Sequence, residues 1–417
     1  MQELEASAQR VIADLKELAA LTSDAHGAQR VAWGPVWRKA RAWFRAKVEH
    51  DLGLAVTTDS AGNLHVVLPG ASDETVIVAS HLDSVPNGGW LDGCLGVLAG
   101  LEAMRRYAGQ KDRRATLRLI DWADEEGARF GRSLVGSSAA GGALNPEDLR
   151  TLKDRSGLTQ AEALAENGVA LDRMLDAHQE LKQINAKAQL ELHIEQGPVL
   201  ETLNKSTGVV LGTFGVERHL LNFTGQAAHS GATPIPMRRD AFLAAAQFAL
   251  EARQIGLRHS RPDAHVVSTC GVVKVEPGIV TAVPGTCEIS LDQRALHAPT
   301  LAAMLAEAKA AAQKAAQENG VALTWKKLWT IEPRLFDQAL IELAREAVRE
   351  ITGDAPVLPS GPLHDSAEMV PHMPAVMLFV YSSRGLSHCK EEDTPLPYLS
   401  QAIQSFILLI EKSLARI

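Results

Sequence analysis

The chain has 417 residues, more than the roughly 250–300 at which one hydrophobic core stops growing, so we expect two structural units. Its residues are 46% apolar and 22% charged, which is typical of a globular enzyme and excludes a disordered chain or a fibrous repeat. The formal net charge of -8 disfavours a nucleic-acid partner, because phosphate contacts need a basic surface.

Signals for export or membrane insertion are missing from the sequence. The first residues carry no basic region followed by an apolar one, and no later stretch reaches the ~20 apolar residues of a membrane span. The four cysteines are scattered without a CxxC pair, which indicates reduced thiols. We therefore expect a cytoplasmic protein with no membrane partner.

The N-terminal part of the chain has the pattern of an α/β unit. Apolar residues at helical spacing predict helices over residues 3–21 and 35–51. Short β-rich runs at residues 75–80 and 116–122 predict two strands, and residues 97–107 between them predict a helix. This strand, helix, strand order indicates a parallel sheet.

The same pattern continues at a charged helical stretch, residues 145–187, and a buried strand, residues 190–194. It returns near the C-terminus with an expected helix over 337–350, a strand over 374–380 and a helix over 397–414. We expect these late elements to rejoin the first sheet.

A different pattern occupies the middle of the chain. It predicts strand, helix, strand, strand, helix, strand, the order of a ferredoxin-like sandwich, over residues 217–224, 238–256, 265–276, 284–294, 299–318 and 321–330. We therefore predict an α/β catalytic domain of residues 1–213 and 332–417, whose mixed, mainly parallel sheet has helices on both faces. An α+β domain of residues 214–331 is inserted into it.

His81-Leu82-Asp83 follows the expected strand 75–80, and Asp92-Gly93 lies in the Gly-rich loop beyond it. Ligands bind beyond the carboxyl ends of strands in such sheets. An imidazole and a carboxylate suit a divalent metal ion, and Asp83 could orient His81 by accepting its other N–H. The pair is weak evidence alone, because a purely structural role is equally common.

Asp124-Glu125-Glu126-Gly127 follows the expected strand 116–122 and brings two carboxylates to the same edge of the sheet. Burying like charges there requires compensating cations. Adjacent side chains point differently, so one can bind metal while the other acts as a base. Taken alone, a solvated acidic loop would be the better interpretation.

Two further histidines arrive at the same edge. His193 lies at the end of the expected strand 190–194, before Glu195-Gln196-Gly197, and His388 follows the expected strand 374–380. The resulting mixed nitrogen and oxygen set suits two divalent cations bridged by one carboxylate. Its members are His81, Asp92, Glu126, His193 and His388.

The expected inserted domain carries two candidate binding residues. His229 lies among small residues, where a solvated loop histidine is the alternative to a functional one. Arg294 ends an expected strand with the side chain best suited to grip a substrate carboxylate. The alternative for Arg294, a salt bridge to Asp292, is the simpler interpretation without further context.

These motifs together resemble a known family. The strings SHLDSVPNGG, DEEGARF and ELHIEQGP, with Gly225-x-x-x-His229 and Ser387-His388, resemble N-carbamoyl-L-amino-acid hydrolases, β-ureidopropionases and allantoate amidohydrolases. That group belongs to the aminoacylase and carboxypeptidase G superfamily of metallopeptidases. The resemblance runs from about residue 20 to the end, and it implies a zinc-exopeptidase-like sheet with an inserted lid and dimerisation domain.

The resemblance also implies roles for individual residues. The five-residue set would bind two divalent metal ions per subunit (Zn, Mn, Co or Ni), Asp92 would bridge them, and Glu125 would be the general base. The family forms a homodimer through its inserted domain, with His229 of one subunit completing the other's site. The substrate-binding positions would be Gln196, His229, Thr281, Arg294, Gly361 and His364.

The function implied is hydrolysis of the C–N bond of an N-carbamoyl or related N-substituted amino acid, a small carboxylate, by metal-activated water. Glu125 would take the water's proton and His229 would stabilise the oxyanion. Two alternatives stay open: an N-acyl-amino-acid amidase or dipeptidase of the same superfamily, and an inactive member that only binds a ligand. We also expect the inserted domain to close as a lid, with hinges near residues 212–216 and 331–334.

The chain departs from the family pattern at several positions. Thr281 stands where an asparagine usually helps to grip the substrate, so the substrate can differ from plain N-carbamoyl amino acids. Cys94 and Cys389 flank expected ligand positions, where inert packing is more common than metal binding.

Overall fold

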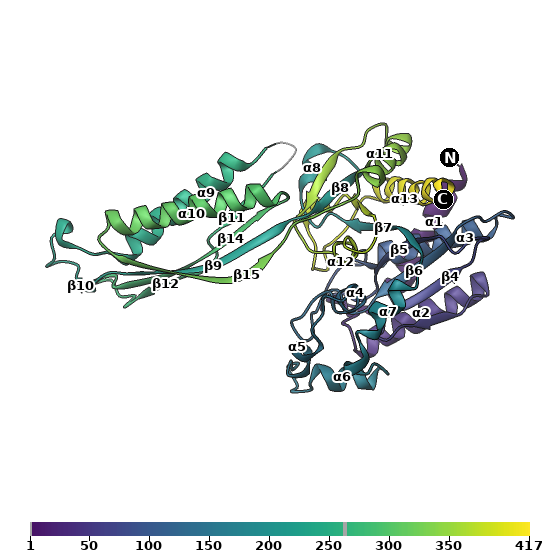
Figure 1. Cartoon of the computed structure of the whole chain (residues 1–417), viewed down its shortest axis with the longest axis horizontal. Helices are drawn as coiled ribbons and strands as arrows, with labels where there is room; N and C mark the ends of the chain where they lie inside the picture. The colour runs from purple at the N-terminus through teal and green to yellow at the C-terminus, as the bar shows by residue number, and fades with distance from the viewer. Residues whose placement is uncertain (1, 262–264) are drawn as a thin grey trace. The chain divides into compact units, whose positions relative to one another are not determined.

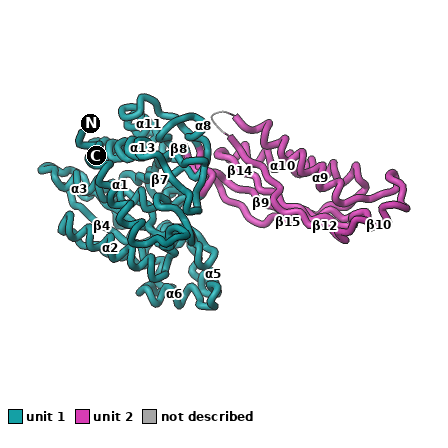
Figure 2. Tube along the Cα trace, turned by 180° about the vertical axis from the view of Figure 1, so that it is seen from behind, with its two compact units in different colours: residues 1–211, 336–358, 363–417 teal, residues 212–335, 359–362 magenta. Residues whose placement is uncertain are grey.

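The computed structural model describes residues 2–261 and 265–417. Residue 1 and residues 262–264, which belong to the predicted domain ranges, lie outside the described residues. The chain divides into two compact units, shown in Figure 2. Unit 1 consists of residues 1–211, 336–358 and 363–417, and unit 2 consists of residues 212–335 and 359–362.

A nine-stranded mixed sheet forms the centre of unit 1 (Figure 1), and only its residues 212–213, 334–335 and 359–360 fall within the ranges of unit 2. Its strands are, in spatial order, β16 (Arg334–Leu335), β8 (Thr207–Thr213), β18 (Ala375–Val380), β7 (Ala186–Ile194), β5 (Thr75–His81), β6 (Thr116–Trp122), β4 (Leu64–Leu68) and β3 (Val56–Thr58), with β17 (Val357–Ser360) also paired with β8.

The four central strands β18, β7, β5 and β6 are parallel, whereas β4 and β8 join their outer sides antiparallel. The sheet is therefore less parallel than predicted, because the short flanking strands were not recognised in the sequence. The parallel centre places the carboxyl ends of β5, β6, β7 and β18 at one edge.

Helices cover both faces of the sheet and bury its central strands on both sides. In β5, Val76 and Val78 belong to one apolar cluster, and Ile77 and Ala79 belong to the other. The first cluster includes side chains of α1 (Gln2–Thr22), α2 (Pro35–Leu52), α3 (Cys94–Ala108), α8 (Val199–Leu203), α11 (Gln338–Thr352) and α13 (Leu396–Arg416). The second includes side chains of α4 (Val135–Gly141), α5 (Pro146–Arg150), α6 (Gln160–Glu166), η1 (Leu171–Arg173), α7 (Asp176–Lys182) and α12 (Asp365–Met369).

Several helices begin where the sequence supplies a cap. Pro35 starts α2 and Asp337 caps α11 by accepting the N–H of Leu340. The expected helical stretch 145–187 is instead several short helices, because glycines and turns interrupt it. None of the helices within the described ranges is long and apolar enough to cross a membrane.

Unit 2 is a two-layer unit with its own apolar cluster. Its five-stranded sheet contains β11 (Val267–Thr269), β12 (Val273–Glu276), β14 (Thr286–Ala295), β9 (Gly215–Thr224) and β15 (Ala322–Ile331). Alternate residues of β14 are buried against the two helices α9 (Ala241–His259) and α10 (Ala298–Glu318). The elements follow the predicted order, except that the expected strand 265–276 is two short strands.

Among the described residues, the remaining short elements are β1 (Ser23–Asp24), β2 (Gly27–Ala28), β10 (Ala228–His229), η2 (Ile235–Met237), β13 (Ala282–Val283) and η3 (Ser383–Gly385).

Candidate active site

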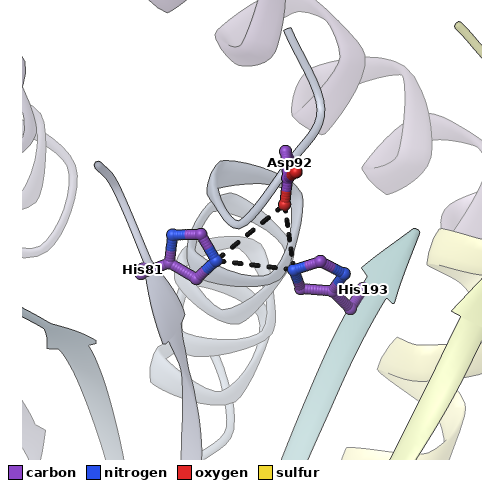
Figure 3. A group of neighbouring side chains, drawn as sticks. All are labelled: His81, Asp92 and His193. Atoms are coloured by element: carbon purple, nitrogen blue, oxygen red, sulfur yellow. Dashed lines mark hydrogen bonds and ion pairs between the residues drawn. The ribbon is translucent and has the colours of Figure 1, made fainter. Parts of the chain in front are cut away.

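His81, Asp92 and His193 form a buried group at the carboxyl ends of the central strands. Val78 of β5 pairs with Leu190 of β7, so three residues farther along these parallel strands the two imidazoles lie side by side. Their Nε2 atoms are 3.4 Å apart. Asp92, from the loop before α3, directs Oδ1 at both rings, 3.1 Å from Nε2 of His193 and 3.9 Å from Nε2 of His81 (Figure 3).

Both histidines are oriented through their other ring nitrogen. Nδ1 of His81 is 3.2 Å from the backbone carbonyl oxygen of Asp83, and Nδ1 of His193 is 2.9 Å from that of Ile194. Because a carbonyl only accepts, each Nδ1 carries a hydrogen, and Nε2 of each ring offers a lone pair when the ring is neutral. This is the orientation in which histidines bind metal ions.

Asp92 also takes part in a second group, with Glu126 and His388. Nε2 of His388 is 3.5 Å from Oδ2 of Asp92 and 3.4 Å from Oε2 of Glu126. The His388 side chain is 50% exposed, so this group is the more accessible of the two. Asp92 thus presents one carboxylate oxygen to each group.

Asp83 holds the acidic pair that follows β6. Its Oδ1 accepts the N–H of Glu125 at 3.3 Å, and its Oδ2 accepts the N–H of Glu126 at 3.2 Å. The carboxylate of Asp83 therefore fixes this loop, whereas the hydrogen bond from His81 goes to the Asp83 backbone. Oε2 of Glu125 lies 3.8 Å from Nε2 of His81, so the two neighbouring carboxylates face different groups.

Burial dominates the electrostatics of the acidic pair. It raises the pKa of Glu125 well above the usual value, and the charges of Asp365 and Glu126 add to this effect. Burial and the charge of Asp92 raise the pKa of Glu126 in the same direction. Such carboxylates stay ionised together only where cations compensate their charge.

The histidines respond differently to their surroundings. Burial lowers the pKa of His81 to about 4, which keeps the ring neutral at pH 7. For His193, burial is outweighed by the nearby Asp92 carboxylate, which raises the pKa to about 9. A metal ion bound there would have to displace that proton, as is common for protein ligands.

The donor set fits divalent metal ions. Oδ1 of Asp92 and Oε1 of Glu126 are both buried: Oε1 accepts no hydrogen bond within the described ranges, and Oδ1 would lose its 3.1 Å contact with Nε2 of His193 as a hydrogen bond once that ring gives up its proton to bind a metal ion. An unsatisfied buried carboxylate oxygen is costly, and one of these oxygens lies in each group. Imidazole nitrogens with carboxylate oxygens are ligands that Zn²⁺ and similar ions accept.

The side chain of Gln196, an expected substrate contact, lies directly at Asp92. Its Nε2 donates to Oδ2 of Asp92 at 3.0 Å and lies 3.3 Å from Nε2 of His388. Its backbone has a φ of 58°, and the N–H donates to Oγ of Ser382. Gln196 therefore supports the Asp92 carboxylate directly.

His364, another expected substrate contact, is buried beside His193, with ring centroids 4.5 Å apart. Its Nε2 has no hydrogen-bond partner among the described residues. With His193 and Glu191 it forms a third group that could hold a metal ion. Both carboxylate oxygens of Glu191 are already hydrogen-bonded, by the hydroxyls of Ser80 and Ser366.

The structure brings His229 and Thr281 together within unit 2. β10 pairs with β13 so that His229 stands opposite Ala282, and the N–H of Ser230 donates to the carbonyl oxygen of Thr281. Nδ1 of His229 accepts the N–H of Gly231 and of Ala232. The hydrogen of the neutral ring is therefore on Nε2, which is free to act as a donor.

Arg294 and Gly361 are also neighbours within unit 2. Nη1 of Arg294 donates to the carbonyl oxygen of Gly361 at 3.2 Å. Nε donates to Oδ1 of Asp292 at 2.8 Å, which is the salt bridge offered above as the simpler interpretation. Arg218 binds the same carboxylate, so a substrate would have to share Arg294 with Asp292.

Cys94 packs as an inert side chain. It is buried, its Sγ donates to the backbone oxygen of Trp90 at 3.1 Å, and burial raises the pKa of its thiol to about 11. Neither Cys94 nor Cys389 belongs to the three groups of described residues that could hold a metal ion.

Sequence reasoning missed two polar residues around the site, Glu191 and Glu392, whereas the resemblance had already placed Asp365 with His364 in a segment that lines the pocket. Each is almost fully buried, at 1–2% exposed. Glu191 stands two residues before His193 on the same face of β7, a spacing that could have indicated it. Glu392 lies within the acidic run Glu391-Glu392-Asp393, which gives no signal of its burial.

Comparisons with known proteins agree with this geometry. Residues 77–412 match the model of peptidase family M20/M25/M40. The chain is 36% identical over 373 residues to an N-carbamoyl-L-amino acid amidohydrolase of Geobacillus stearothermophilus, covering 88% of each chain. It is 30% identical to the allantoate amidohydrolase of Escherichia coli K12, covering 93% of each. A crystal structure of a hydantoinase/carbamoylase family amidase from Burkholderia multivorans superposes with a TM-score of 0.86 at 30% identity, covering 97% of each chain.

Proposed function

The chain belongs to peptidase family M20/M25/M40 and is an amidohydrolase of the N-carbamoyl amino acid and allantoate type, and we propose that it hydrolyses the C–N bond of a small N-substituted amino acid with two divalent metal ions. One observation carries the proposal. Asp92 offers a separate oxygen to each of two ligand groups, with Glu125 beside them.

The first ion would be held by His81, Asp92 and His193, and the second by Asp92, Glu126 and His388. Paired divalent ions of this kind lower the pKa of water and polarise a carbonyl group. The third group, which includes His364, is a poorer candidate, because hydroxyl groups already satisfy Glu191.

Glu125 acts as the general base in this proposal. Burial and the neighbouring carboxylates raise the pKa of Glu125, and a raised pKa makes its carboxylate a stronger proton acceptor once metal ions keep it ionised. Asp83 fixes its backbone, so the carboxylate is held in place before substrate arrives. Glu125 takes the proton of the attacking water and afterwards gives it to the leaving nitrogen.

Residues of unit 2 complete substrate binding in this proposal. Nε2–H of His229 donates to the developing oxyanion, a contact whose loss typically costs on the order of 100–1000-fold in rate. Arg294 and the backbone at Gly361 bind the substrate carboxylate, and Thr281 contributes a hydroxyl group. Unit 2, as the inserted domain of residues 214–331, closes as a lid during this step.

We also propose that the enzyme is a homodimer formed through unit 2. Leu243, Leu250 and Leu257 on α9 are spaced seven residues apart and are 49%, 70% and 57% exposed. Near His229 and Thr281, the apolar side chains of Ile235, Met237, Ile279 and Val280 are also exposed. Exposed apolar surface of this kind marks protein interfaces. His229 would then act in the partner's site, as the family resemblance implies.

We propose that the protein is cytoplasmic, because all four cysteines are free thiols. Burial raises the thiol pKa of Cys94, Cys270 and Cys287, which makes these three thiols less reactive. Reduced thiols are normal in that compartment.

A hydrolysis screen tests the function. Purified protein loaded with Mn²⁺ or Zn²⁺ is incubated with N-carbamoyl, N-formyl and N-acyl amino acids, ureido acids and dipeptides, and both products are measured. Release of ammonia from ureido substrates supports the proposal, whereas release of a carboxylic acid or an amino acid alone identifies an N-acyl amidase or dipeptidase. Metal-loaded protein that cleaves no member of the panel would indicate a binding protein.

A further inference from the structure

Glu392 joins the two loops that carry ligands of the proposed metal centre. It lies four residues after His388, in the segment between η3 and α13, and it is only 2% exposed. Its Oε1 accepts the backbone N–H of Leu91 at 3.1 Å and of Asp92 at 3.0 Å. One carboxylate oxygen thus fixes the backbone of the bridging residue.

The other oxygen of Glu392 reaches the same aspartate through a hydroxyl group. Oγ of Ser387 lies 3.0 Å from Oε2 of Glu392 and 3.0 Å from Oδ2 of Asp92. Ser387 immediately precedes His388 in the chain. Glu392 therefore contacts the backbone of Asp92 directly and its side chain through the residue next to His388.

The loop before α3 approaches Glu392 closely. Gly89 has no side chain there, and a Cβ atom at this position would overlap the carboxyl group and Cβ of Glu392. Nε1 of Trp90 donates to Oδ1 of Asp393 at 3.2 Å, a more exposed contact between the same two loops. The two segments are about 300 residues apart in the sequence, so local structure does not hold them together.

We propose that Glu392 is a positioning residue for the metal centre: it holds the Asp92 loop against the His388 loop, so that both oxygens of Asp92 face their ligand groups. This inference rests on the proposed function. Residues that hydrogen-bond to metal ligands and orient them have this role, and their loss typically weakens metal binding about 10–100-fold.

The test is a titration of the metal-free protein with Mn²⁺ alone, followed by equilibrium dialysis and elemental analysis. We expect Glu392→Ala to weaken Mn²⁺ binding about 10–100-fold. Glu392→Gln keeps an oxygen for the two N–H groups and an amide that donates to Ser387, so it should bind Mn²⁺ nearly as well as the wild type. Glu391→Ala is the matched control, because it removes the same charge from the exposed neighbouring residue and should leave binding unchanged.

Gly89→Ala is an independent variant that displaces Glu392 without changing any charge. It should weaken Mn²⁺ binding in the same direction as Glu392→Ala. Far-UV circular dichroism of the metal-free variants checks that they fold. If Glu392→Ala does not fold, the Mn²⁺ affinity of Gly89→Ala tests the proposal instead. Because Glu392 touches no reacting atom, turnover of Glu392→Ala should recover largely at high Mn²⁺, unlike that of a variant lacking the base.

The outcomes separate this inference from the proposed function. If the wild type binds Mn²⁺, and folded Glu392→Ala and Gly89→Ala bind it equally well, Glu392 is not a positioning residue. The proposed function would still stand in that case. Weak binding that Glu392→Gln fails to rescue also overturns the hydrogen-bonding role. A wild-type protein that binds no Mn²⁺ would overturn both.

Discussion

At the scale of single residues, the proposed chemistry depends on a division of roles between Glu125 and Glu126. Both backbone N–H groups are held by Asp83, yet Glu125 faces the His81 side and Glu126 faces His388. The sequence motif showed that two carboxylates follow β6. Their separate directions depend on the loop conformation, in which Asp124 adopts a φ of 60°.

Glu125→Gln should remove the base and keep the metal ions. We expect turnover to fall by about 100- to 10,000-fold, the usual contribution of general acid–base catalysis, with wild-type metal content by elemental analysis. Glu126→Gln is the comparison, since it should reduce metal content instead. Activity retained in Glu125→Gln would refute its assignment as the base.

At the scale of elements, close packing at the ends of strands sets the positions of the proposed metal ligands. Gly93 precedes α3 with a φ of 66°, and a Cβ atom there would overlap the imidazole ring of His81. Both the backbone conformation and the space therefore require glycine. Asp92 is thus placed as one proposed metal ligand, and Gly93 leaves room for the imidazole of His81, a second proposed ligand.

Gly93→Ala should displace His81 and lower metal affinity about 10-fold or more, since the ring loses its orientation. Calorimetric titration with Zn²⁺ measures the change. Gly131→Ala is a suitable control, because Gly131 has a similar positive φ of 83° but nothing within 4 Å of an added Cβ. Equal Zn²⁺ affinity in the two variants would contradict this view of the loop.

A buried ion pair anchors β6 to α2 beneath the site. Nε of Arg41 is 2.7 Å from Oδ2 of Asp121, and Oδ1 of Asp121 accepts the N–H of Leu82. Because removing one partner leaves a buried charge, Arg41→Met should lower the free energy of unfolding by about 3–5 kcal/mol, measured with urea. Lys39→Met, at an exposed position of the same helix, should change it by about 0.5 kcal/mol or less. If Arg41→Met lowers the free energy of unfolding as little as Lys39→Met does, the ion pair does not stabilise the fold.

At the scale of the whole molecule, the proposed homodimer buries the exposed leucines of α9, Leu243, Leu250 and Leu257, in its interface. Leu250→Glu places a charge at its most exposed leucine and should convert the dimer to a monomer in analytical ultracentrifugation. Activity should fall with it, because His229 would no longer reach the partner's site. Lys111→Glu, an exposed charge change in unit 1, should leave the dimer intact. A monomeric wild type, or a dimeric Leu250→Glu, would contradict the proposed interface.

The strongest periodic patterns predicted the main elements well. The helices α1, α2, α10 and α13 and the central strands β5 and β6 lie within a few residues of expectation, since long or fully buried elements have clear patterns. The flanking strands β3, β4, β8 and β17 are short or lack such a pattern, and they were missed. Without them, the antiparallel sides of the sheet could not be foreseen.

The candidate site was predictable to the extent that parallel strands bring their carboxyl ends together. His81, Glu125, Glu126, His193 and His388 follow from that rule, since each comes after an expected strand. Glu392 could not be found in the same way, because its contacts depend on two loops about 300 residues apart. The hydrogen bonds between Glu392 and the Asp92 loop therefore become visible only in the tertiary structure.

The central claim is that Asp92 bridges two divalent metal ions, and anomalous diffraction from a crystal of Mn²⁺- or Zn²⁺-loaded protein tests it most directly. We expect two anomalous peaks on either side of the Asp92 carboxylate, one in contact with His81 and His193 and the other in contact with Glu126 and His388. Metal-loaded crystals with no peak at Asp92, or with none of these five side chains in contact with metal, would contradict the account.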